Sequence, residues 1–199
     1  MRYPVTAVRD HASLLNDVAP LIRDPQFLYR GRDVPNFPLR PREILCNWLI
    51  CAVLNDQVEP HAWTFTTDPT GGDGVIVNRA TETGSTMEHV FIPNREQTES
   101  IEALIVGAIQ SKSAIGEAYA RGKHLVVFSD LPGGPWHANR VAREISGAHT
   151  FEAIWVVALE RGDGRYYSYW VTQLGNPASP VWRVSIDLQE LNWKVERVQ

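Results

Sequence analysis

The sequence has 199 residues, of which 44% are hydrophobic, and its formal net charge is −4. This length and composition suffice for one buried core and do not require a second domain. The acidic balance excludes a protein that coats nucleic acid through overall positive potential. The longest apolar run, from Ile44 to Leu54, is about half as long as a bilayer crossing needs, so we predict no membrane-spanning segment.

The first part of the chain is rich in arginine and proline. Seven arginines and four aspartates lie within residues 1–42, and several prolines indicate an irregular connection before residue 41. We predict an N-terminal arm over residues 1–40 with a short helix over 11–22 that Pro20 limits, followed by a single core domain over 41–199. The arginines of the arm are interpreted either as phosphate contacts or as an ordinary solvated surface. The start of the sequence lacks the pattern of a secretion signal, which predicts a cytoplasmic location.

The order of the core elements follows from hydrophobic periodicity and turn residues. We predict a helix over 41–54, strands over 61–67, 73–78 and 87–92, a helix over 94–121, a strand over 124–128, a helix over 139–146, and strands over 151–159, 166–174 and 181–188. The first three strands are joined by turns and should form an antiparallel meander, whereas strands separated by a helix imply parallel crossovers. The predicted fold class is therefore α/β, with a central mixed sheet flanked by helices.

The two cysteines do not indicate a metal site. Cys46 and Cys51 lie five positions apart in the first core helix, where their side chains diverge too far to form a disulfide. No second pair of cysteines or histidines lies at ligand spacing around them, so both are interpreted as small buried residues and zinc is not expected.

Two acidic residues each open an apolar strand. Asp73 follows Gly71-Gly72 at the start of the second strand, and Glu88 stands near the start of the third. Carboxylates brought together in this way are the ligands that Mg²⁺ or Mn²⁺ prefers. Asp73 also fits a turn residue that accepts hydrogen bonds from nearby backbone amides, whereas an ionised Glu88 in an apolar strand must reach water, a cation or a basic side chain. His89 alternates to the opposite face and is interpreted as a core histidine.

Lys112 lies in the middle of the apolar stripe of the helix predicted over 94–121. The third strand descends at about 3.3 Å per residue from Glu88 and the helix returns at about 1.5 Å per residue, which brings position 112 back to about the level of Glu88. We therefore predict that the ammonium group of Lys112 meets the two carboxylates. The alternative is a lysine whose charged end extends to solvent from a slightly rotated helix.

This order of a helix, three meander strands, a helix, a strand, a helix and a strand resembles the core of the PD-(D/E)XK nucleases, the restriction-endonuclease-like superfamily. The resemblance covers roughly residues 41–159 and aligns Asp73 with the family's strand-two aspartate and Glu88 with its strand-three acidic residue. Val90 stands where the family has a lysine, and the resemblance assigns that role to Lys112, because members are known to move an active-site side chain onto this helix. It implies that Asp73 and Glu88 bind Mg²⁺ or Mn²⁺, that Lys112 orients the attacking water, that Glu43 assists, and that nucleic acid is the substrate.

Three interpretations stay open at this stage. The first is a metal-dependent nuclease, and the second is a non-catalytic interaction or regulatory protein that retains the nuclease-like fold, as Val90 favours. The third is a small-molecule enzyme that uses the tryptophan-rich carboxy-terminal half and a pocket away from Asp73. Glu43 also fits an ordinary first-turn glutamate favoured by the helix dipole. The choice between DNA and RNA, and the formation of a homodimer, are not decided by the sequence.

Overall fold

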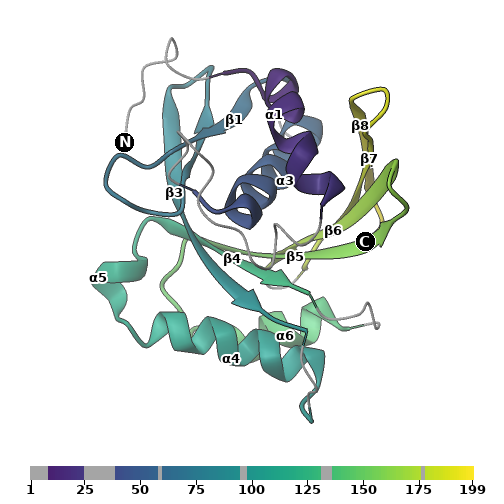
Figure 1. Cartoon of the computed structure of the whole chain (residues 1–199). Helices are drawn as coiled ribbons and strands as arrows, with labels where there is room; N and C mark the ends of the chain where they lie inside the picture. Colours follow the sequence, from purple (N-terminus) through teal and green to yellow (C-terminus); the bar gives the residue numbers. More distant parts are fainter. Residues whose placement is uncertain (1–8, 25–38, 58–59, 95–97, 131–135, 176–177) are drawn as a thin grey trace.

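An eight-stranded mixed sheet organises the chain, with the strands arranged in sequence order from β1 to β8 (Figure 1). The computed structural model describes residues 9–24, 39–57, 60–94, 98–130, 136–175 and 178–199. The strands are β1 (Trp63–Thr66), β2 (Val75–Asn78), β3 (Thr83–Ile92), β4 (Lys123–Ser129), β5 (Ala153–Gly162), β6 (Tyr166–Leu174), β7 (Val181–Asp187) and β8 (Asn192–Arg197). β3, β4 and β5 are parallel to one another, and the remaining neighbours are antiparallel. The predicted α/β class with a mixed sheet and flanking helices is confirmed.

Helices cover both faces of the sheet and bury a separate apolar core on each. On one face lie α1 (His11–Arg23) and α3 (Pro41–Gln57), around which the later strands curl (Figure 1). On the other lie α4 (Ile101–Ser113) and α6 (Ala138–Ile145), with the one-turn helix α5 (Glu117–Ala120) beyond the end of α4. None of the described helices is both long and apolar enough to cross a membrane.

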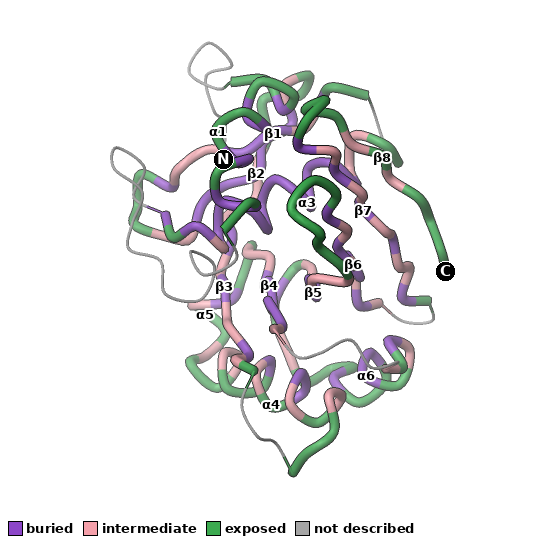
Figure 2. Tube along the Cα trace, turned by 45° about the vertical axis from the view of Figure 1, so that its right-hand side comes forward, coloured by how far each residue is buried: buried purple, intermediate pink, exposed green. Residues whose placement is uncertain are grey.

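The helix α3 is buried on nearly all sides, which explains why its sequence shows an apolar run and no stripe. Leu45, Trp48 and Leu49 are fully buried. By contrast, the burial colouring of Figure 2 shows exposed residues along α4 and α6. The helix ends at Gln57, three residues beyond the predicted end. Cys46 and Cys51 are buried free cysteines on this helix, as predicted.

The helix of the predicted arm is part of the core. Leu15, Val18 and Ile22 of α1 are fully buried in the cluster that α3 also enters. The helix continues through Pro20 to Arg23, because the proline lies on the exposed side of its last turns. The predicted connection over residues 25–38, including Arg30 and Arg32, lies outside the described residues, as does Arg2.

The helix predicted over 94–121 is wrong at both ends. The structure has α4 beginning at Ile101, where the Ser100 hydroxyl accepts a hydrogen bond from the Ala103 amide at 3.2 Å, so Ser100 is the cap and Asn94 is not. Gly116, at φ 121°, breaks the helix before α5. The break leaves Ile115 58% exposed, although the sequence places it on the apolar stripe.

Two strand predictions also need correction. Residues 83–86, interpreted as part of a polar turn, are the first residues of β3, and their backbone pairs with β2 from Val75↔Thr86 to Asn78↔Thr83. Polar side chains are accepted here because the hairpin end is only partly buried. The last strand, β8, is absent from the prediction because only two of its six residues, Trp193 and Val195, turn to the core.

Candidate functional site

The two predicted acidic residues lie side by side where β3 passes the residues that lead into β2. The Asp73 amide donates to the Met87 carbonyl at 3.2 Å, and the Met87 amide donates to the Gly74 carbonyl at 2.8 Å. This pairing sets the Asp73 side chain beside the backbone of Glu88 and His89. Its Oδ2 accepts a hydrogen bond from the His89 amide at 2.7 Å.

Asn47 of α3 links the segment that contains Asp73 to the part of β3 that contains His89. Its Nδ2 donates to the Asp73 carbonyl at 3.0 Å, and its Oδ1 lies 3.0 Å from Nε2 of His89. Gly74 adopts φ 110°, and a Cβ on this residue would lie 2.5 Å from Nδ2 of Asn47. Glycine is therefore required at position 74 both by backbone conformation and by the close approach of Asn47.

Glu88 faces α4 and binds Lys112 there. Nζ of Lys112 lies 2.6 Å from Oε1 of Glu88 and 3.4 Å from the hydroxyl of Tyr119. A second ammonium group, from Lys123 at the start of β4, lies 3.9 Å from Oε2 of Glu88 and 4.2 Å from the centre of the Tyr119 ring. The side chain of Glu88 is only 12% exposed, so the two lysines compensate a largely desolvated charge.

The carboxyl groups influence one another electrostatically. Burial raises the pKa of Asp73, and the charge of Glu88 adds to this rise, while the His89 amide and the charge of Lys112 oppose it. Burial also raises the pKa of Glu43, with a further contribution from Asp73. We call Glu43, Asp73 and Glu88 the acidic cluster. A positive ion bound beside Asp73 would oppose the rise of its pKa.

Lys112 stays charged in this setting. Burial works to lower its pKa, but the hydrogen bond and the charge of Glu88 raise it overall. Burial and the neighbouring Glu88 raise the pKa of Tyr119 to about 12, so its hydroxyl keeps its proton.

Glu43 has a structural task at the start of α3. Its Oε2 accepts a hydrogen bond from the Arg40 amide at 2.8 Å, which is one half of a capping box. The guanidinium group of Arg40 lies 3.8 Å from Oε1 of the same side chain. The capping interaction holds Glu43 where the charge of Asp73 adds to the rise of its pKa.

The structure therefore brings Lys112 to Glu88, Glu88 to Asp73, and Glu43 to the electrostatic neighbourhood of Asp73. His89 is buried and bonded to Asn47, as a core histidine should be, and burial lowers its pKa to about 3. Asn47, Tyr119 and Lys123 were not predicted from the sequence as site residues. A parallel crossover to the strand predicted over 124–128 indicates that the start of that strand lies near the third strand, but the register that brings Lys123 to Glu88 is not specified by the sequence.

Two carboxylates suit Mg²⁺, which keeps several water ligands, better than a cation that takes all of its ligands from the protein. Asp73 and Glu88 supply two carboxylates, and Mg²⁺ is usually held by one or two carboxylates while keeping several waters. Among the described residues, no group of three or more histidine, cysteine, aspartate or glutamate side chains is arranged to hold a metal ion. A cation here would consequently depend on water and on a bound phosphate for its remaining ligands.

Comparisons with known proteins add no family to this description. The chain matches no protein-family model and no curated protein.

Proposed function

We propose that the protein hydrolyses phosphodiester bonds of nucleic acid with the help of Mg²⁺ or Mn²⁺. The observation that carries this proposal is the 2.6 Å contact between Lys112 and Glu88, together with the electrostatic influence of both groups on the nearby Asp73. A divalent cation bound there would polarise a phosphoryl oxygen and make a water nucleophilic.

The arrangement of the elements supports the same proposal. The antiparallel series β1, β2 and β3 is followed by α4, β4, α6 and β5, with β3, β4 and β5 parallel. This is the order expected for a restriction-endonuclease-like core, in which Val90 replaces the strand lysine and Lys112 of α4 takes its role.

Each side chain has a task in this reaction. Asp73 and Glu88 would hold the cation, and Asn47 and the His89 amide keep the Asp73 segment in place. Lys112 holds a proton at Nζ and donates a hydrogen bond that orients the water or a phosphate oxygen. Glu43 assists from the start of α3 by adding negative charge close to Asp73.

The direct test is magnesium-dependent cleavage of single- and double-stranded DNA and RNA by the purified protein and by Asp73→Asn. We expect cleavage by the wild type and a loss of at least about a hundredfold in the variant. Asp56→Asn, at the exposed end of α3, is the matched control and should retain full activity. Equal cleavage by wild type and Asp73→Asn, from preparations free of contaminating nuclease, would refute the proposal.

One observation favours the second candidate, a non-catalytic interaction protein with a nuclease-like fold. Glu88 already has two lysines near it, at 2.6 Å and 3.9 Å, so its charge is compensated without a metal. For such a protein, millimolar Mg²⁺ or Mn²⁺ would leave the melting temperature unchanged and no substrate would be cleaved.

A further inference from the structure

The strand β8 forms one edge of the sheet (Figure 1). In the described part of the chain it pairs with β7 alone, in an antiparallel register from Trp182↔Arg197 to Asp187↔Asn192. An edge strand presents backbone amides and carbonyls that no neighbouring strand satisfies, and these groups can pair with a strand of another molecule. The side chains of β8 therefore decide whether it repels such a strand or accepts one.

Alternate residues of β8 direct their backbone groups away from β7. The Val198 amide donates to the Val181 carbonyl at 2.9 Å, in line with the register of the two strands. Opposite residues of antiparallel strands alternate between hydrogen-bonded and non-hydrogen-bonded pairs, so the even-numbered residues of β8 bond to β7. The odd-numbered residues direct their amides and carbonyls outward, and these are Trp193, Val195 and Arg197.

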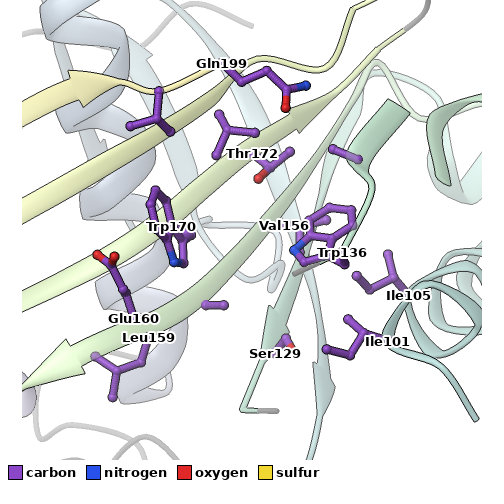
Figure 3. A pocket seen from close by; sticks show the side chains of 14 residues that line it. Ile101, Ile105, Ser129, Trp136, Val156, Leu159, Glu160, Trp170, Thr172 and Gln199 are labelled. Atoms are coloured by element: carbon purple, nitrogen blue, oxygen red, sulfur yellow. The ribbon is translucent and has the colours of Figure 1, made fainter. Parts of the chain in front are cut away.

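The sheet and the core hold this edge in place at both ends. Near its start, the Trp193 ring meets the ring of Trp48 edge-on, with 5.3 Å between their centres. After its end, Val198 and Gln199 line a pocket of about 510 Å³ (Figure 3), and Nε2 of Gln199 donates to the Ser179 carbonyl at 3.1 Å. The edge is therefore already ordered, which lowers the entropic cost of pairing with it.

The side chains of β8 are self-complementary about Val195. When two copies of β8 lie antiparallel with Val195 opposite Val195, Lys194 of each copy lies opposite Glu196 of the other. Both charged side chains are exposed, and opposite charges in a non-hydrogen-bonded pair stabilise a sheet. The same register places Trp193 of one copy opposite Arg197 of the other, which is a favourable pairing of an aromatic ring with a cation.

The neighbouring symmetric registers bring like charges together. A register centred on Lys194 places the two Lys194 side chains opposite each other, and one centred on Glu196 does the same with two glutamates. Like charges directly opposite each other destabilise a sheet. Charged side chains thus guard this edge against other strands, and they favour a second copy of the same strand in the register centred on Val195.

Exposed apolar side chains flank β8 at both ends. Leu191 precedes the strand and is 38% exposed, and Val198 follows it and is 42% exposed. In the register centred on Val195, Leu191 of one copy and Val198 of the other lie at the same end of the paired strands. Association of two copies would therefore cover part of the apolar surface at each end.

We propose that two copies of this chain associate through β8, antiparallel and centred on Val195. The outward amides and carbonyls of Trp193, Val195 and Arg197 then bond between the copies, and the sheet continues from one copy into the other. The contact is symmetric, because each copy contributes the same residues. It involves no residue of the acidic cluster, so it stands or falls independently of the proposed function.

Sedimentation equilibrium over a range of concentrations up to about millimolar tests the association. We expect the wild type to reach twice the chain mass of 22.4 kDa. Val195→Pro removes the central outward amide and keeps the pairing with β7, so it should remain folded and monomeric. Val195→Ala keeps that amide and is the matched control, which should dimerise. A wild type that stays monomeric throughout, or a dimer that persists in Val195→Pro, would overturn the inference.

Reversal of single charges tests the register. Lys194→Glu sets glutamates opposite each other at two equivalent positions, and Glu196→Lys does the same with lysines, so each variant should dimerise about tenfold or more weakly than the wild type. An equimolar mixture of the two variants restores opposite charges at both positions and should recover the association. Dimerisation that is unchanged in the single variants, or that does not recover in the mixture, would contradict the register.

A disulfide between copies gives a readout that does not depend on affinity alone. Opposite residues of a non-hydrogen-bonded pair have Cα atoms about 4.5 Å apart, which a disulfide can span. A mixture of Lys194→Cys and Glu196→Cys should form a cross-linked dimer on mild oxidation, and each variant alone should form much less. The native Cys46 and Cys51 are buried and should not compete. Equal cross-linking in the mixture and in the separate variants would refute the centre at Val195.

Discussion

The acidic cluster and the turn around Asp187 hold carboxylates in opposite electrostatic conditions. At the turn, Arg165 binds Asp187 at 2.7 Å, the amides of Gln189 and Glu190 donate to the same carboxylate, and this set of donors lowers the pKa of Asp187 to about 2. In the acidic cluster, burial and neighbouring carboxylates raise the pKa of Asp73 and of Glu43. The turn stabilises the ionised form of its carboxyl group, whereas the acidic cluster disfavours the ionised forms of Asp73 and Glu43.

This difference separates a structural carboxylate from a candidate functional one. The Asp187 turn joins the ends of two neighbouring hairpins, where Tyr166 pairs with Asp187 and the Leu188 amide donates to the Arg165 carbonyl. All of its donors are supplied by the protein. In the acidic cluster Asp73 and Glu43 each accept a backbone hydrogen bond, but burial and a neighbouring carboxylate still raise the pKa of both, which is the condition that a bound cation would relieve.

Removal of the positively charged side chains should have the largest effect on nucleic acid cleavage, and the effect should differ most between the two regions. Lys112→Met is expected to lower nucleic acid cleavage about a hundredfold or more, because it removes the ammonium group closest to Glu88. Lys123→Met should have a smaller effect, since its Nζ lies 3.9 Å away. Arg165→Met, which breaks the ion pair of the Asp187 turn, should leave the cleavage rate unchanged. Steady-state rates of the three folded variants measure the comparison, and equal losses in all three would contradict it.

The two regions also differ in the space that surrounds a glycine, because a Cβ atom would collide with Asn47 at Gly74 and would meet nothing at Gly164. Gly74→Ala should destabilise the protein by about 2 kcal/mol or more, because the new Cβ would collide with Asn47 in addition to the strain of φ 110°. Gly164→Ala, beside the Asp187 turn, has φ 91° and open space around the Cβ, so we expect a loss of about 1 kcal/mol. Urea unfolding of both variants gives the two values. A smaller loss for Gly74→Ala than for Gly164→Ala would show that Asn47 does not fix the Asp73 segment.

The smallest effect is the pH dependence of the Asp187 turn. A lowered pKa means that ionised Asp187 stabilises the folded state above its ordinary value of 3.8, and that this contribution is lost as the pH falls toward about 2. The difference in unfolding free energy between wild type and Asp187→Asn should therefore be constant near neutral pH and shrink in acid. Urea unfolding over a pH series measures it, and a difference that does not change with pH would rule out the donor set as its cause.

Much of the site follows from sequence because it depends on distances along regular elements. From Glu88 to Ile92 the strand covers about 13 Å, and from Ile101 to Lys112 the helix covers about 16 Å, so the lysine returns to the level of the glutamate. The late start of α4 improves this match over the longer helix that the sequence predicts. The helical period and the helix start at Ser100 together place Lys112 at the level of Glu88.

The missed residues depend on pairings between distant segments. The register Thr86↔Lys123 between two parallel strands brings Lys123 to Glu88, and no local pattern specifies that register. A pocket on the same face of the sheet as α4 likewise combines Trp136 and Trp170, which belong to different elements and line one cavity only after the sheet has formed. β8 escaped prediction because most of its side chains face solvent.

The central claim is that Asp73 and Glu88 bind a divalent cation, and calorimetric titration with Mn²⁺ tests it most directly. Wild type and Asp187→Asn should each bind Mn²⁺ at one site, and Asp73→Asn should lose that binding, because only the first two retain both carboxylates beside Lys112. Mn²⁺ binding that persists unchanged in Asp73→Asn, or that is absent from the wild type, would contradict the account.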